Sequence, residues 1–317
     1  MKYYIGIDGG ATESKCVVTD SGLKIIYSTK GGPTNFLIRG TDEVCDNIYE
    51  LVKSCIENIS ITKNDSVILS IGTTGAGRKT DVDKLHSALT AFLQTKGYAF
   101  ENILIESDVR IALEGAFTGG PGMLLIAGTG SIILGKDMNG SIHRAGGFGR
   151  FIGDEGSGYS IGRKGLQAVS KYFDGRGEDT LLVHLLVEQY NINDSASLID
   201  SVYNKNFDIP SVTMLVVGAA NKRDSVCMQI LDDESDELIL HVECLMKKLV
   251  EENINLCLIG SLITNENYYS ISFGEKLAEK YPLVKIKNPD YPPEVGAVIL
   301  AMKDILIKKE MNKKNRH

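Results

Sequence analysis

The chain has 317 residues, of which 43% are hydrophobic and 24% are charged, a composition typical of a globular protein with a large buried core. Its formal net charge of −7 argues against a nucleic-acid partner, because a phosphate backbone is bound through clustered Lys and Arg. The basic run at 308–316 is interpreted as a solvated helix end. No apolar run is long enough to span a bilayer, and Met1-Lys2 enters a predicted strand without a signal peptide. We therefore expect a cytoplasmic protein with no membrane partner.

Hydrophobic periodicity predicts alternating strands and helices in the N-terminal half. The expected strands occupy residues 3–8, 15–20, 24–30, 66–71 and 102–106. The expected helices occupy residues 43–59, 81–95 and 109–117. The glycine-rich segment at 118–122 ends this pattern, and there we place the boundary between a first domain (1–118) and a second domain (119–292).

The second half repeats this order with insertions. Its expected strands occupy residues 123–135 as a hairpin, 141–145, 255–259 and 284–286. Its expected helices occupy residues 157–171, 178–188, 236–251 and 273–281, and a last helix begins after Pro292-Pro293. The sequence therefore predicts a duplicated α/β fold with a cleft between the two halves.

The six cysteines are scattered along the chain and show no CxxC spacing. Most lie in apolar runs, and they do not combine with the five His residues in a zinc-like spacing. We therefore expect buried free thiols rather than a metal cluster or a disulfide framework.

Two glycine turns of the same form lie in different halves of the chain, each between two apolar strands. The first is Asp8-Gly9-Gly10-Ala11-Thr12, and the second is Gly128-Thr129-Gly130-Ser131. Glycine turns expose backbone N–H groups that bind phosphate oxygens, because no side chain screens them. Neither turn is a Walker loop or a dinucleotide-binding fingerprint, since each leads into a strand rather than a helix. We infer that the two turns hold one phosphate chain from both sides.

Two aspartates lie where strands are expected to end. Asp8, beside the first glycine turn, suits a magnesium ion held directly or through water, although an aspartate can also stabilise a tight turn. Asp108 precedes a predicted helix, and a carboxylate at such a strand end can accept a proton from an attacking hydroxyl. The alternative role of Asp108 is that of a helix N-cap, and both roles can hold together.

A long glycine-rich segment at 146–158 carries Asp154 and Glu155 just before a predicted helix. Carboxylates and backbone groups on such a loop suit hydrogen bonds to sugar hydroxyls, and for Glu155 a purely structural loop is the alternative. Asn35, in the glycine-rich segment 31–36, can present its amide to a polar substrate or only stabilise a turn.

Eight motifs, in this order along the chain, carry a resemblance to a known family. They are IGIDGGATESKCVVTD, GGPTNF, TTGAGR, IESDVRIAL, LLIAGTGSIILG, GGFGRFIGDEGSGYSIG, LIGSLITNENYY and PPEVGAVILA. Over nearly its whole length the chain resembles the N-acetylglucosamine kinase branch of the BadF/BadG/BcrA/BcrD-type ATPases. That family lies in the superfamily that joins sugar kinases, actin and heat-shock chaperones.

The resemblance implies a duplicated ribonuclease H-like fold, as in actin-like ATPases, with two lobes, five-stranded mixed sheets and a central cleft. The C-terminal helix at 293–317 would complete the first lobe. The resemblance also implies ATP and Mg²⁺ as cofactors and an amino sugar as the small-molecule substrate, with Asp108 as the catalytic base and Asp8 as the metal ligand. The residues implied to contact ATP are Gly9, Gly10, Thr12, Thr129, Gly130, Ser131, Gly218, Gly260 and Ser261. Those implied to contact the sugar are Asn35, Gly75, Asp108, Gly147, Phe148, Gly149 and Asp154.

One departure from the family pattern concerns the sugar loop. Many relatives carry Trp there, whereas this chain has no Trp and places Phe148 at the position. Phe keeps an apolar face but lacks the indole N–H donor, which leaves the amino sugar open between N-acetylglucosamine and N-acetylmuramic acid. Arg150 or Arg78 could meet the lactyl carboxylate of N-acetylmuramic acid.

We therefore expect an ATP-dependent kinase that phosphorylates the 6-hydroxyl of an N-acetylated amino sugar, with a role in amino sugar metabolism and cell wall recycling. We expect it to form a homodimer. Three alternatives remain: a glucosamine kinase, a sugar-sensing module without catalysis, and the ATPase activator of a radical 2-hydroxyacyl-CoA dehydratase. Such an activator holds an iron–sulfur cluster through a Cys beside the second glycine turn, and the segment 124–135 has no Cys.

Overall fold

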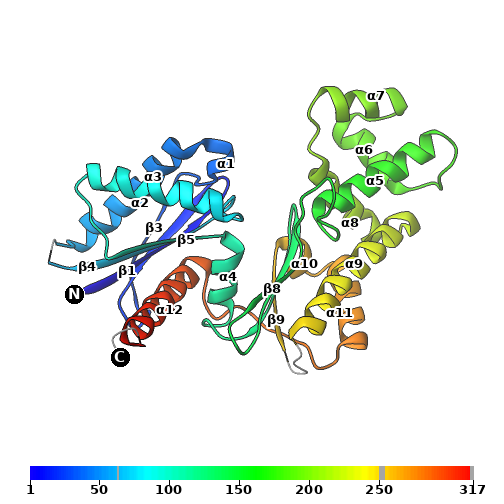
Figure 1. Cartoon of the computed structure of the whole chain (residues 1–317). Coiled ribbons are helices and arrows are strands. Elements are labelled where there is room, and N and C mark those ends of the chain that lie inside the picture. Colours follow the sequence, from blue (N-terminus) through cyan, green and yellow to red (C-terminus); the bar gives the residue numbers. More distant parts are fainter. Residues whose placement is uncertain (63, 250–253, 315–317) are drawn as a thin grey trace. The chain divides into compact units, whose positions relative to one another are not determined.

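The computed structural model describes residues 1–62, 64–249 and 254–314, and the chain divides into two compact units (Figure 1). The first unit, unit one, comprises Met1–Gly120 and the segment that begins at Asn288, and the second, unit two, comprises Pro121–Lys287. Arg316 of the basic C-terminal run, and the last two residues of the helix expected at 236–251, lie outside the described residues.

Unit one is built on a sheet of five strands in the order β3-β2-β1-β4-β5. The strands are β1 (Lys2–Gly9), β2 (Ser14–Thr19), β3 (Ile25–Gly31), β4 (Ser66–Thr73) and β5 (Asn102–Glu106). The first three strands are antiparallel, whereas β4 and β5 run parallel to β1. The helices are α1 (Phe36–Arg39), α2 (Thr41–Ile59), α3 (Lys79–Thr95), α4 (Asp108–Ala116) and α12 (Pro293–Lys314). Helices α2 and α3 cover one face of this sheet, and α4 and α12 cover the other (Figure 1).

The alternation of side chains along β1 determines what each face of this sheet carries. Ile5 and Ile7 are fully buried in the core beneath α2 and α3, whereas Tyr4 packs in the core with α12. Gly6 lies on the α12 face, where a Cβ would overlap the carbonyl oxygen of Glu294. Glycine at this position lets the first turn of α12 lie against the strand. By the same alternation Asp8 faces α12.

Unit two repeats this topology. Its strands are β6 (Gly122–Ala127), β7 (Ser131–Lys136), β8 (Ile142–Gly146), β9 (Asn255–Ile259) and β10 (Lys285–Ile286). Their order is β10-β9-β6-β7-β8, so a three-stranded antiparallel meander is again extended by two parallel strands. The two described sheets therefore match strand for strand, and the expected duplicated ribonuclease H-like fold with mixed five-stranded sheets is confirmed.

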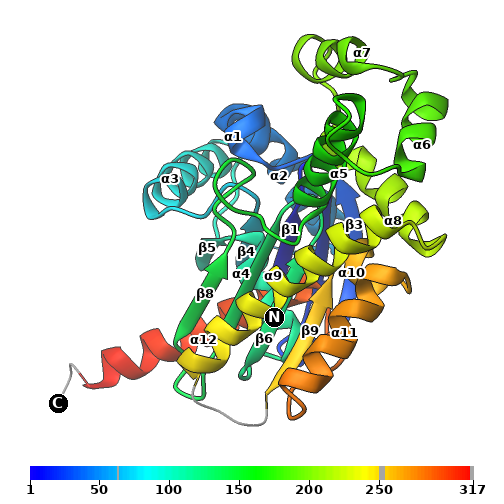
Figure 2. The same cartoon turned by 90° about the vertical axis from the view of Figure 1, so that its right-hand side faces the viewer.

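The helical part of unit two is larger than that of unit one. Its helices are α5 (Gly158–Phe173), α6 (Leu181–Tyr190), α7 (Ser195–Ile199), a π-helix (Asp200–Asn204), a 3₁₀-helix (Ile209–Val212), α8 (Thr213–Asn221), α9 (Ser225–Leu249), α10 (Ser261–Thr264) and α11 (Tyr268–Lys280). Helix α9 packs on β7 and β8, and α11 lies beside it (Figure 2). Their apolar sides close a core that includes the fully buried rings of Tyr269 and Phe273.

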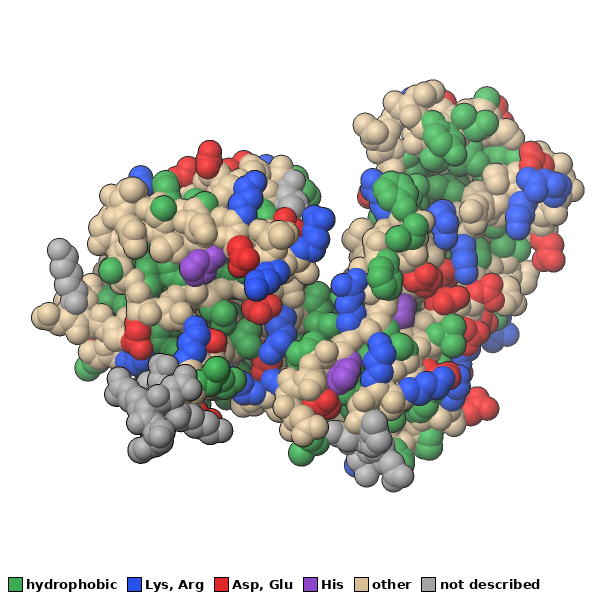
Figure 3. Space-filling view, viewed as in Figure 1, with side chains coloured by type: hydrophobic (Ala, Val, Ile, Leu, Met, Phe, Trp, Pro, Cys, Tyr) green, Lys and Arg blue, Asp and Glu red, His purple; other side chains and the backbone are tan. Residues whose placement is uncertain are grey.

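The cysteine side chains are mostly buried, and many charged side chains lie on the surface (Figure 3). All six cysteines are free; five are buried and Cys244 is partly exposed. Figure 3 shows acidic and basic side chains interspersed over the described surface of each unit on the face drawn. Within residues 1–62, 64–249 and 254–314, every helix is too short or too polar to cross a bilayer.

Candidate functional site

The first glycine turn follows β1 and folds against the segment that precedes α1. A Cβ at Gly9 would overlap the Thr34 hydroxyl, so this position requires glycine. The Gly10 N–H donates to the Glu13 carbonyl (3.2 Å), and the Thr34 N–H donates to the Gly10 carbonyl (3.1 Å). These contacts bring the buried Asn35, the residue after Thr34, close to the turn in space. Thr12 lies exposed at the far end of the turn, in the segment leading to β2.

Asp8 belongs to a group of carboxylates on the α12 face of unit one. Burial, the charge of Glu294 and the charge of Asp108 raise the pKa of Asp8 from 3.8 to about 6, and Lys15 on the neighbouring strand opposes this rise. Each of these acidic side chains disfavours ionisation of Asp8, since like charges repel. A divalent cation would remove this repulsion and favour the ionised form.

The carboxylates near Asp8 fit a magnesium ion. Carboxylate oxygens are ligands that Mg²⁺ prefers, and Glu294 Oε2 is buried without a hydrogen-bond partner among the described residues. The same part of the chain contains no group of three or more His, Cys, Asp or Glu side chains that could together hold a metal. An ion at Asp8 would therefore take most of its ligands from water and phosphate, as Mg²⁺ commonly does.

Asp108 is the first residue of α4, and both of its oxygens accept hydrogen bonds. The Val109 N–H donates to Oδ1 (2.8 Å), and the Thr74 hydroxyl donates to Oδ2 (2.6 Å). The N-cap of α4 is Ser107, whose hydroxyl oxygen accepts from the Arg110 N–H, and β5 ends at Glu106. The strand predicted at 102–106 is thus confirmed, whereas the alternative that Asp108 caps the helix is wrong, because the preceding serine supplies the cap.

Thr74 connects Asp108 to the first glycine turn. Its N–H donates to the Gly9 carbonyl (3.2 Å), while its hydroxyl donates to Asp108. Gly75 follows with a φ of 98°, which lets the chain turn at the end of β4. Unit one thus gathers the first glycine turn, Asp8 and Asp108 at the carboxyl ends of β1, β4 and β5, where α/β sheets bind their ligands. The role of Thr74 could not be identified from the sequence, because its link to Asp108 spans two strands.

The second glycine turn lies at the N-terminus of α5. The Gly158 N–H donates to the Gly128 carbonyl (2.7 Å), and the Tyr159 N–H donates to the Thr129 carbonyl (3.1 Å). Thr129 is exposed, whereas Ser131 is buried and its hydroxyl donates to the Glu155 carbonyl (2.5 Å). A glycine turn at a helix N-terminus favours an anion, because backbone N–H groups and the helix dipole act together.

Asp154 joins the glycine-rich loop to this second turn. Asp154 Oδ1 accepts from the Gly149 N–H (3.2 Å), and a Cβ at Gly130 would lie 2.9 Å from Asp154 Oδ2. Asp154 also has a φ of 60°, which is uncommon for a residue other than glycine and is retained where surrounding contacts impose it. The residue expected to contact sugar and the turn expected to contact phosphate are therefore in direct contact.

The glycine-rich loop is shaped at its start by an arginine. Arg144 donates to the carbonyl oxygens of Gly146 (3.0 Å) and Gly147 (2.5 Å), and its guanidinium lies 5.1 Å from the centre of the Phe148 ring. Phe148 is 66% exposed, so its ring is available to an incoming ligand. Gly149 has a φ of 87° and no atom within 4 Å of where its Cβ would lie.

The end of the loop is anchored by Glu234 of α9, which is 1% exposed. It accepts from the Gly156 N–H (2.5 Å) and the Ser160 hydroxyl (2.8 Å), and it pairs with Lys164 (2.8 Å). The Tyr269 hydroxyl donates to the Gly156 carbonyl (2.6 Å). Sequence reasoning missed Glu234, because it lies before the helix predicted at 236–251, in the acidic run 232–236.

The residues expected near the nucleoside lie on two separate segments of unit two. Gly260 has a φ of 112°, and a Cβ there would overlap the Ala127 carbonyl at the start of the second glycine turn. Ser261 follows as the exposed first residue of α10. Gly218 lies in α8, and no atom lies within 4 Å of where its Cβ would be. Gly260 therefore borders the second turn, whereas the role of Gly218 stays a prediction.

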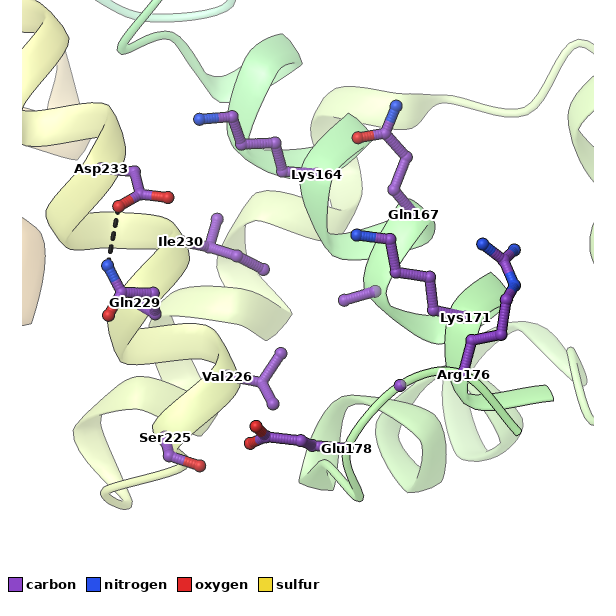
Figure 4. A pocket seen from close by; sticks show the side chains of 12 residues that line it. Lys164, Gln167, Lys171, Arg176, Glu178, Ser225, Val226, Gln229, Ile230 and Asp233 are labelled. Carbon is purple, nitrogen blue, oxygen red and sulfur yellow. Dashed lines mark hydrogen bonds between the residues drawn. The ribbon is translucent and has the colours of Figure 1, made fainter. Parts of the chain in front are cut away.

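A cavity of about 630 Å³ lies between α5 and α9 (Figure 4). Its walls include Lys164, Lys171 and Arg176 on one side and Gln229 and Asp233 on the other. None of the residues predicted to contact ATP or sugar lines it. This cavity is therefore separate from the residues predicted to bind ligands.

Comparison with known proteins agrees with the motifs. The model of the BadF/BadG/BcrA/BcrD ATPase family matches residues 5–301. The chain is 34% identical to an N-acetylmuramic acid/N-acetylglucosamine kinase of Clostridium acetobutylicum, over 95% of this chain and 98% of that protein. It is 30% identical to an N-acetyl-D-glucosamine kinase of Dictyostelium discoideum, over 94% and 97%.

The fold comparison points the same way. A crystal structure from Chromobacterium violaceum, of a protein assigned provisionally as an N-acetylglucosamine kinase, superimposes with a TM-score of 0.73. The match covers 95% of this chain and 99% of that one at 19% identity, which supports the fold. The resemblance inferred from the motifs is confirmed by the family match: the chain belongs to the BadF/BadG/BcrA/BcrD ATPase family.

Proposed function

We propose that the protein is an ATP-dependent kinase that transfers a phosphoryl group to the 6-hydroxyl of N-acetylglucosamine and of N-acetylmuramic acid. The two relatives described above act on these sugars by name, and both align over nearly their full length. The observation that carries the proposal is Asp108, a half-buried carboxylate held by Thr74 beside the first glycine turn. A carboxylate fixed in this way suits the role of a general base.

The chemistry assigned to these residues is direct phosphoryl transfer. Asp108 accepts the proton of the 6-hydroxyl while the sugar oxygen forms a bond to the γ-phosphorus. The bond between that phosphorus and the β–γ bridging oxygen breaks, and ADP leaves. Little covalent chemistry falls to the protein, so its contribution is positioning and stabilisation of charge.

The remaining site residues would bind and orient the reactants. Backbone N–H groups of both glycine turns would hold phosphate oxygens, and Asp154 with its loop would hold the sugar hydroxyls. Asp8, in the neighbourhood of Glu294, would hold magnesium, which supplies neutralisation of phosphate charge when bound. Gly260 and Ser261 would border the nucleoside, and Asn35 with Gly75 would border the sugar.

Two further expectations belong to this proposal. We propose that the two units, with a boundary near residues 118–120, act as the two domains of a cytoplasmic enzyme. We also propose a homodimer, which light scattering of the purified protein tests directly.

The test of the function is a coupled assay of ADP release. The purified protein is supplied with MgATP and, separately, N-acetylglucosamine, N-acetylmuramic acid, glucosamine or glucose. We expect ADP release that depends on one or both N-acetylated sugars. A preference for glucosamine would favour the glucosamine kinase alternative. Binding of sugar without ADP release would favour the sensing module, and iron in the purified protein would favour the dehydratase activator.

A further inference from the structure

Arg150 is a guanidinium without an acidic partner on the glycine-rich loop. Its side chain is exposed, and its Cζ lies 5.0 Å from the centre of the Phe151 ring and 5.8 Å from that of the Tyr159 ring. Within the part of the chain that the structure describes, it makes no hydrogen bond or ion pair. Two aromatic rings therefore restrict the guanidinium while its N–H donors stay available to a ligand.

Two other arginines, Arg144 beside the loop and Arg78, the second candidate from the sequence, are already engaged. Arg144 donates to two carbonyl oxygens of the loop and so maintains its shape. Arg78 belongs to unit one, where its Nε donates to Asp81 (2.8 Å). Of the candidates raised by the sequence, Arg150 is thus the one whose donors are uncommitted.

The backbone around Arg150 is fixed by contacts to the candidate site. The Gly149 carbonyl accepts from the N–H groups of Ile152 (3.3 Å) and Gly153 (2.9 Å), which closes a turn over Arg150. The Gly149 N–H in turn donates to Asp154, whose other oxygen lies against the second glycine turn. Arg150 is therefore presented on the same short turn as the carboxylate expected to bind the sugar.

We propose that Arg150 binds the carboxylate of the lactyl ether of N-acetylmuramic acid and sets the preference of the enzyme between that sugar and N-acetylglucosamine. This inference rests on the proposed function, since it assigns one group of the substrate to one residue of the same site. A guanidinium presents two parallel N–H donors to a carboxylate, and such charge-assisted bonds are strong. N-acetylglucosamine has a hydroxyl where the lactyl ether is attached, so it offers this arginine no anion.

The test combines variants of the enzyme with variants of the substrate. Wild type and Arg150→Met are assayed with N-acetylmuramic acid, its methyl ester and N-acetylglucosamine. We expect Arg150→Met to lower kcat/KM for N-acetylmuramic acid about 10- to 100-fold. For the methyl ester and N-acetylglucosamine the change should stay within about twofold, because neither carries the charge. Arg150→Lys keeps the positive charge but not the planar pair of N–H donors, so its loss of kcat/KM on N-acetylmuramic acid should lie between those of wild type and Arg150→Met.

Controls and contrary outcomes are distinct. Arg176→Met removes an exposed arginine that pairs with Asp174, and it should leave the ratio between the two sugars unchanged. Equal losses of kcat/KM on N-acetylmuramic acid and its methyl ester, or no loss on either, would overturn the role of Arg150. The proposed kinase activity would be unaffected by that result. Wild-type activity on N-acetylglucosamine with none on N-acetylmuramic acid would also overturn it. If none of the amino sugars supports ADP release, the proposed function is rejected, and this inference with it.

Discussion

The raised pKa of Asp8 predicts that this residue costs stability at neutral pH. Burial and the charges of Glu294 and Asp108 raise its pKa from 3.8 to about 6, so the folded state holds this proton more tightly than the unfolded chain. The stability contributed by that proton is complete below pH 3.8 and is lost as the pH rises through about 6. At pH 8 the ionised carboxylate lowers the free energy of unfolding by about 3 kcal/mol, less the part that solvent screens.

Asp8→Asn removes this charge with little change of shape. We expect the free energy of unfolding of the apo protein to rise by about 2–3 kcal/mol at pH 8 and by about half as much at pH 5. Urea denaturation followed by circular dichroism measures both values. Asp46→Asn, at an exposed position of α2, is the control and should stay within about 0.5 kcal/mol of wild type. Destabilisation of Asp8→Asn at pH 8, or a gain that does not depend on pH, would refute the reasoning.

Substitutions at three further positions test how the site is held together. Thr74→Val removes the hydroxyl that orients Asp108, so steady-state kinetics should show kcat reduced about 5- to 10-fold with the KM for ATP nearly unchanged. A rise in the KM for ATP by the same factor as the fall in kcat would contradict this. Gly130→Ala brings a Cβ within 2.9 Å of Asp154 Oδ2 and should lower kcat/KM for the sugar about 10- to 100-fold, with wild-type activity as the contrary result. Glu234→Ala strips a buried network of its acceptor and should cost about 3–5 kcal/mol in urea denaturation, whereas Glu234→Gln should cost less; equal losses would show that the charge is unimportant.

Much of the fold follows from patterns that are local in sequence. The parallel strands β1 and β4 are continuous apolar runs, and the helices α2 and α3 show clear helical periodicity, so both kinds of element could be predicted. Helix α9 was predicted to start at 236, whereas it begins at Ser225, because the acidic run at 232–236 looks like a loop. In the structure Asp232 accepts from the hydroxyls of Tyr268 (2.8 Å) and Ser272 (2.6 Å). Those partners lie on α11, so tertiary contacts account for the difference.

The candidate site likewise combines features that could be recognised from the sequence with features that depend on tertiary packing. Glycine at positions 9 and 130 is required by close approach of neighbouring atoms, and the turns that contain these glycines could be recognised from the sequence. Thr74 and Glu294 reach Asp108 and Asp8 only through the packing of β4 and of α12, which the sequence order does not reveal. The alternative role of Asp108 as the N-cap was wrong, because Ser107 and Asp108 are both good caps and the backbone selects the serine.

The central claim is that the carboxylate of Asp108 activates the sugar hydroxyl, and single-turnover phosphoryl transfer measures this most directly. Asp108→Asn keeps the shape of the side chain but cannot accept the proton. We predict that the rate of 6-phosphate formation, followed by rapid quench and phosphorus NMR, falls at least about 100-fold. Dissociation constants for MgATP and for the sugar, measured by calorimetry, should stay within about threefold of wild type. Transfer by Asp108→Asn at near the wild-type rate would contradict the account.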